Sequence, residues 1–224
     1  MNALADPEIV YSDENSIGGT SRVGNVQSHP ADTTVIFGTS MTQRLISSKL
    51  SKGTHKKCIN ISNSGDTILK ISQRIEQFYH APNTKVDSIE KILFSFGTND
   101  IRFRRGVKKF KTPILELISK TKQYFPNAQI VFQSVLPMKI TNNFIAENFT
   151  SFNKMLYDIC IVEHCYFQDI FYKFLNADGS DFNSGIYRDR LHLNHFGTSI
   201  LAKCFKHVIK KDLFNPIIKV KRTR

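Results

Sequence analysis

Asp189 and His192 stand three residues apart in a chain of 224 residues, a spacing that could serve hydrolytic chemistry. A carboxylate this close can hold one nitrogen of the imidazole ring, while the other nitrogen takes a proton from a reacting group. Such a pair supplies the base of a catalytic triad and the group that orients it, and it needs a hydroxyl nucleophile from elsewhere in the chain. The best candidate is Ser40, in the sequence FGTSM at 37–41.

Acyl transfer also needs N–H donors for the negative oxygen that forms during the reaction. We expect the backbone N–H groups of Ser40 and Gly65 and the side-chain amide of Asn99 to supply them. Gly65 suits close approach to a substrate because it has no Cβ. Asn99 offers a donor that carries no charge and cannot form an ion pair with His192.

Alternating strands and helices must position these residues. Short apolar runs predict five strands, at 34–37, 57–61, 89–96, 128–135 and 165–169. Apolar residues at helical spacing predict helices at 41–50, 67–79, 112–124, 144–162 and 199–209. This alternation favours an α/β fold in which parallel strands are joined by right-handed crossovers, with helices on both faces of the sheet.

The candidate site residues come directly after three of these strands. Ser40 follows the first strand, Gly65 the second and Asn99 the third. Ligands of parallel sheets bind in the crevice at the carboxyl ends of the strands. The loop that carries Asp189 and His192 can return to that edge, so we expect the whole constellation to meet there.

Four short sequences in this order resemble the SGNH (GDSL-type) hydrolase superfamily: GTS at 38–40, SGDT at 64–67, GTND at 97–100 and DRLH at 189–192. The resemblance spans about residues 33–210 and implies a three-layer α/β/α fold with a five-stranded, mostly parallel, flavodoxin-like sheet. It implies a serine esterase without metal or cofactor that acts on a small acyl ester, such as an acetyl ester. Ser40 would be the nucleophile, Gly65 and Asn99 oxyanion residues, and Asp189 and His192 the rest of the triad.

The chain departs from the family's pattern at two places. Thr39 replaces the aspartate that usually precedes the serine, and Arg190 lies between the triad's Asp and His in sequence. We expect Arg190 to face outward.

His195 is a second candidate base, for which we expect packing or hydrogen bonding at a helix start. The α/β-hydrolases share the order Ser, Asp, His, but their Gly-x-Ser-x-Gly motif is absent because residue 42 is Thr.

A basic cluster follows the third strand, and the formal net charge of the chain is +12. Its members are Arg102, Arg104, Arg105, Lys108, Lys109 and Lys111. A charge run is often only a solvated face, but this one could bind RNA or another polyanion through phosphates. The alternative function is therefore an RNA-binding SGNH-like domain with weak or no catalysis. A looser resemblance points to esterase-like domains of invertebrate or retrotransposon proteins, or to Oskar-type (OSK) RNA-binding domains.

Composition and residue patterns also give predictions for domain organisation, localisation and the state of the cysteines. Residues 1–32 are polar and predict a flexible tail, residues 33–212 a single domain, and residues 213–224 a basic C-terminal tail. Neither a signal peptide nor a run of about 20 apolar residues is evident, which indicates an intracellular, cytoplasmic protein. The four cysteines form no CxxC pair and predict buried free thiols rather than a metal site. Oligomeric state stays open.

Overall fold

The computed structural model describes residues 31–103, 106–138, 143–179 and 182–211. Both predicted tails, apart from residues 31–32, and the side chains of Arg104 and Arg105 lie outside this description.

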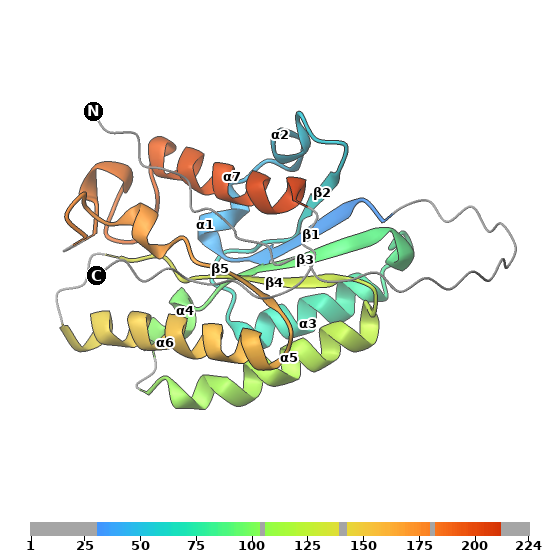
Figure 1. The fold of residues 1–224 in the computed structure, drawn as a ribbon, viewed down its shortest axis with the longest axis horizontal. Coiled ribbons are helices and arrows are strands. Elements are labelled where there is room, and N and C mark those ends of the chain that lie inside the picture. The colour runs from blue at the N-terminus through green and yellow to red at the C-terminus, as the bar shows by residue number, and fades with distance from the viewer. Residues whose placement is uncertain (1–30, 104–105, 139–142, 180–181, 212–224) are drawn as a thin grey trace, which may run out of the picture.

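Five parallel strands form one sheet in the order β2-β1-β3-β4-β5 (Figure 1). The strands are β1 (Thr33–Gly38), β2 (Lys57–Asn60), β3 (Ile89–Ser95), β4 (Gln129–Gln133) and β5 (Tyr166–Gln168). Every residue of β1 is buried, as expected for a strand with helices on both faces of its sheet. The predicted α/β fold with a five-stranded parallel sheet is confirmed.

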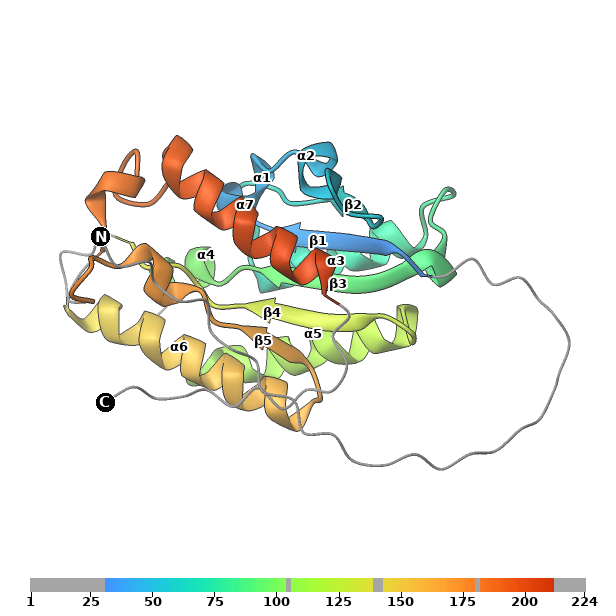
Figure 2. The ribbon, with the colours of Figure 1, turned by 45° about the horizontal axis from the view of Figure 1, so that its top comes forward.

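Helices cover both faces of the sheet and make three layers (Figures 1 and 2). One face carries α3 (Ile68–Tyr79), α5 (Lys111–Tyr124) and α6 (Asn143–Val162). The other carries α1 (Ser40–Gln43), α2 (Ser47–Ser51) and α7 (His195–Lys210). The short α4 (Thr98–Phe103) follows β3 at the carboxyl end of the sheet.

Two apolar cores lie between these layers, because side chains alternate between the faces of a strand. Val35 and Phe37 of β1 enter the core with α3, α5 and α6, whereas Ile36 enters the core with α7. In the first core the ring of Phe94 lies 5.9 Å from that of Phe37 and 5.0 Å from that of Phe132. These packed rings fix the central strands, whose ends carry the candidate site.

Local structure differs from the prediction in three segments. The helix predicted at 41–50 is divided into α1 and α2, because Asn60 Nδ2 donates to the carbonyls of Thr42 and Leu45 at 2.8 Å each. The last helix begins at His195 instead of 199, because the side chain of Asn194 accepts the N–H of Gly197 and caps it. The connection predicted after β3 contains α4 and a 3₁₀ turn at Lys108–Phe110.

Over the described ranges, none of the helices combines the length and the apolar character needed to cross a membrane.

Candidate active site

Ser40 is the first residue of α1 and follows directly after β1. The turn before it requires glycine, because a Cβ on Gly38 would lie 2.1 Å from Thr42 Oγ1. The Thr42 hydroxyl hydrogen-bonds the Thr39 carbonyl at 3.1 Å and Ser62 Oγ at 2.8 Å. Ser40 is half-buried. Thr39, which replaces the expected aspartate, is buried and makes no side-chain cap to α1.

Residues 63–66 form a tight turn after β2, which we call the oxyanion turn. The N–H of Asp66 donates to the carbonyl of Asn63 at 3.4 Å and closes the turn. Gly65 occupies its third position with φ of +79°, a backbone conformation that glycine adopts without strain. No atom lies within 4 Å of the place that a Cβ on Gly65 would take, so the requirement for glycine comes from its backbone.

Asn99 connects the third predicted motif to the oxyanion turn. It lies in the first turn of α4, and its Nδ2 donates to the carbonyl of Asp66 at 2.9 Å. An amide nitrogen carries two hydrogens. The contact with Asp66 holds one of them and fixes the plane of the amide.

Asp189 and His192 lie in a tight loop that is closed by an isolated antiparallel bridge between Tyr187 and Leu193. Asp189 Oδ1 accepts the backbone N–H groups of Leu191 and His192 at 2.8 and 2.7 Å. Asp189 Oδ2 lies 2.9 Å from Nδ1 of the His192 ring. The structure therefore brings the two predicted residues together, with the carboxylate on one ring nitrogen.

Hydrogen bonds to its charged form hold the pKa of Asp189 well below its usual range. The largest cause is the backbone N–H of His192, and the N–H of Leu191 and the His192 ring add to it. Arg190 is exposed, as predicted, but the neighbouring Arg188 places Nη2 3.3 Å from Asp189 Oδ2. Because both partners of this pair are about half exposed, solvent weakens it.

His195 is the exposed first residue of α7, in keeping with a role at a helix start. Its ring packs beside Phe196, with 6.1 Å between the ring centroids, and its carbonyl accepts the hydroxyl of Ser199 at 3.0 Å. Among the described residues, no carboxylate orients this ring. Of these two imidazoles, that of His192 is therefore the one with a carboxylate partner among the described residues.

Hydrogen bonds link the first three motifs to one another. Asn63 donates its N–H to the carbonyl of Gly38 at 3.0 Å, which joins the Ser40 turn to the oxyanion turn. The segment before α7, which carries Asp189 and His192, lies at the same end of the sheet as α1 and α4 (Figure 2). Within the described part of the chain, Ser40 and His192 form no hydrogen bond with each other, and in enzymes such a contact often tightens only with substrate bound.

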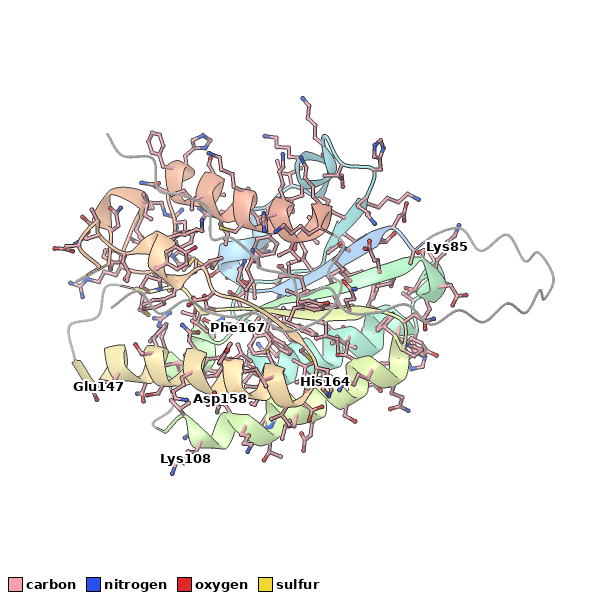
Figure 3. The ribbon with its side chains drawn as sticks, viewed as in Figure 1. Lys85, Lys108, Glu147, Asp158, His164 and Phe167 are labelled. Atoms are coloured by element: carbon pink, nitrogen blue, oxygen red, sulfur yellow. The ribbon has the colours of Figure 1, made fainter. Side chains whose placement is uncertain are left out.

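The basic cluster runs from α4, the short helix that also carries Asn99, to the start of α5. Arg102, Lys108, Lys109 and Lys111 are exposed. A shallow hollow of about 560 Å³ opens beside them, lined by Gly106, Val107, Lys108, Lys109, Asn148 and Ser151. Figure 3 shows Lys108 on the outer side of the helical layer that contains α5 and α6. Arg104 and Arg105, two members of the predicted cluster, lie outside the described residues.

The four cysteines are buried and free, as predicted, and burial raises the pKa of Cys58 and Cys165 to about 12. In the described ranges, no three or more His, Cys, Asp or Glu side chains gather where they could hold a metal ion.

The sequence matches the model of the GDSL-like lipase/acylhydrolase family over residues 26–200. A GDSL-like lipase from Bacteroides thetaiotaomicron is similar in structure, with a TM-score of 0.65 and 17% identity over 82% of this chain and 90% of that chain. The acetylxylan esterase Axe2 from Geobacillus stearothermophilus has a TM-score of 0.62 and 14% identity over 84% of this chain and 98% of that chain. No curated protein matches the sequence. Since the family model covers most of the chain, the protein belongs to the GDSL-like lipase/acylhydrolase family.

Proposed function

We propose that the protein is a serine esterase that hydrolyses small acyl esters, with acetyl esters as the first candidates. Ser40 is the nucleophile, His192 the base and Asp189 the residue that orients the base. Family membership supports acyl hydrolysis, and the similar enzyme Axe2 is an acetylxylan esterase. Known structures of Axe2 include two catalytic mutants, one at an aspartate and one at a serine.

The paired contacts of Asp189 are the observation that carries this proposal. Two backbone N–H groups hold its carboxylate charged and in place, so it accepts the proton on Nδ1 of His192. The lone pair then resides on Nε2, where it can take the proton of Ser40 Oγ. The carboxylate also stabilises the imidazolium that this transfer creates.

The reaction follows from these positions in two halves. Ser40 Oγ attacks the ester carbonyl as His192 takes its proton, and His192 returns that proton to the departing alcohol. Water, deprotonated by His192, then attacks the acyl-serine. The bond between the acyl carbon and Ser40 Oγ breaks, His192 returns the proton to Ser40 Oγ, and the acid is released. In both halves the negative oxygen would accept hydrogen bonds from the N–H groups of Ser40 and Gly65 and from Nδ2 of Asn99.

Hydrolysis of p-nitrophenyl acetate tests the proposal. We expect Ser40→Ala and His192→Ala to lower kcat by about 10³-fold or more, because each removes a member of one catalytic unit. His195→Ala, which removes the neighbouring imidazole, is the matched control and should keep near-normal kcat. Turnover by folded wild-type protein that does not exceed the Ser40→Ala background would reject the esterase function.

A second candidate function is the binding of RNA through the basic cluster, which could accompany or replace catalysis. The exposure of Lys108 and Lys109 favours it, since both ammonium groups are then open to phosphates. Phosphate contacts of this kind would give binding that is independent of sequence and weakens with salt.

Fluorescence anisotropy with a single-stranded RNA tests this candidate. We expect the double variant Lys108→Gln/Lys109→Gln to weaken binding severalfold and to lower the slope of log K against log salt, because two phosphate contacts are lost. The matched control is Lys49→Gln/Lys52→Gln, which removes the same charge from exposed positions around α2. Equal losses in the two double variants would mean that the cluster has no special role.

A further inference from the structure

Arg74 of α3 has no part in the chemistry above, yet its guanidinium group binds directly to the oxyanion turn. We propose that Arg74 is a positioning residue for the oxyanion hole. It acts through Asp66, which fixes both the turn that presents Gly65 and the amide of Asn99. This inference rests on the proposed esterase function.

The carboxylate of Asp66, to which Arg74 binds, is buried. Only 1% of its side chain is exposed, and Arg74 Nε donates to its Oδ2. The side chain of Asn63 lies on the other oxygen at 3.4 Å. A buried carboxylate without a cation would be strongly unfavourable, so the ion pair with Arg74 stabilises the buried position of the Asp66 side chain.

Three polar groups of Asp66 hold the proposed oxyanion donors. Its carboxylate binds Arg74, its N–H closes the turn onto Asn63, and its carbonyl accepts Nδ2 of Asn99 at 2.9 Å. A shift of Asp66 would therefore displace the N–H of Gly65 and the amide of Asn99 together. Misplacement of catalytic groups by about 1 Å can cost on the order of 100-fold in rate.

The first turn of α3 has an anchor that does not depend on Arg74. Asp100 Oδ1 accepts the N–H of Ile68 at 3.2 Å, and Ile71 and Ile75 of the same helix are fully buried in the core. Arg74 itself is about one-third exposed and contributes little to that core. We therefore expect α3 to form without the guanidinium, so a variant at position 74 stays folded.

Kinetics with p-nitrophenyl acetate measure the effect. Arg74→Met should lower kcat about 10- to 100-fold and change KM less than about threefold, because the oxyanion donors act in the transition state. Arg74→Lys should fall between Arg74→Met and wild type. The double variant Asp66→Asn/Arg74→Met should recover much of the loss, since it leaves no buried charge. Lys70→Met, which removes an exposed cation from the same helix, is the control and should have no effect.

Equal kcat values in Arg74→Met and Lys70→Met would overturn the proposal, provided that wild-type turnover depends on Ser40. Failure of the double variant to exceed Arg74→Met would also overturn it.

Nuclear magnetic resonance gives a test that does not depend on activity. The side-chain NH₂ signals of Asn99, assigned by their loss in Asn99→Ala, and the backbone signal of Gly65 should both move in Arg74→Met and stay fixed in Lys70→Met. Unmoved signals in Arg74→Met would overturn the positioning role even in an active enzyme. Moved signals in a protein without esterase activity would instead support the positioning role and reject the proposed function.

Discussion

Asp189 differs from the other site residues because its own loop positions it. The N–H groups that hold its carboxylate belong to Leu191 and His192, two and three residues away. Ser40, Gly65 and Asn99 instead depend on contacts between separate strands and turns. The loop is thus a local unit that delivers an oriented imidazole to the edge of the sheet.

The pKa of Asp189 gives a pH-dependent prediction for this unit. Because its pKa is lowered on folding, its contribution to stability is complete above the unfolded value of about 3.9 and is lost as the pH falls toward the folded value. A ¹³C titration of its carboxyl carbon should show a midpoint well below 3.9. His192→Ala should keep the midpoint low, because the backbone N–H groups remain. A midpoint near 3.9 in the wild type would contradict the geometry of the loop.

Residue types and their order along the chain were enough to nominate Ser40, His192 and Asp189, but not the groups that support them. Arg74 and Asp66 are eight residues apart, one in a helix and one in a turn before it, so no helical spacing predicts their contact. Arg188 was missed for a similar reason, since the loop's path decides which arginine meets Asp189. The sequence shows an acid, Asp66, directly after Gly65. It does not show that this acid is buried, and burial is what makes a cationic partner necessary.

At the scale of elements, the strands were predictable because parallel strands buried on both faces are continuous apolar runs. The helix predicted at 41–50 was wrong as one element, since a side chain from β2 divides it. The first turn of α7 was missed because His195 and Phe196 are exposed and add nothing to its apolar period. The apolar period of the sequence therefore failed to predict helix bounds where a tertiary hydrogen bond divides a helix or where a helical turn is exposed.

Gly65 and Gly53 form a matched pair for testing the oxyanion turn. Their φ values are +79° and +76°, and at both sites the space within 4 Å of where a Cβ would stand is open. Alanine at either site should cost about 1–2 kcal/mol of unfolding free energy, from backbone strain alone. Only Gly65→Ala should also lower kcat/KM, by about tenfold or more, because it displaces a proposed oxyanion donor. Thermal unfolding and ester hydrolysis measure the two effects, and equal activity in both variants would contradict the role of the turn.

At the scale of the whole molecule, the two ends of the sheet carry different groups. The carboxyl end holds the candidate site, while the start of β3 at the amino end holds a buried ion pair. There the fully buried Lys91 lies 2.6 Å from Glu90, which also binds Lys56 at 3.0 Å. Substitutions of Glu90 or Lys91 should alter the free energy of unfolding and leave kcat unchanged.

Substituting Glu90 and substituting Lys91 should change the free energy of unfolding by different amounts. Glu90→Gln leaves the buried ammonium group of Lys91 without a counter-charge and should destabilise the fold by about 3 kcal/mol or more. Lys91→Met leaves Glu90 paired with Lys56 and should change stability by only about 1 kcal/mol. Urea unfolding measures both values, and kcat of Lys91→Met should equal that of wild type. Equal destabilisation by the two substitutions would contradict this account of the amino end.

Covalent labelling by a fluorophosphonate, mapped by mass spectrometry, tests the central claim most directly, since the reagent reacts with a serine that a neighbouring base activates. We expect one adduct on the intact protein, located at Ser40, that His192→Ala abolishes and His195→Ala retains. A folded wild-type protein that forms no adduct, or forms it at another residue, would contradict the assignment of Ser40 and His192.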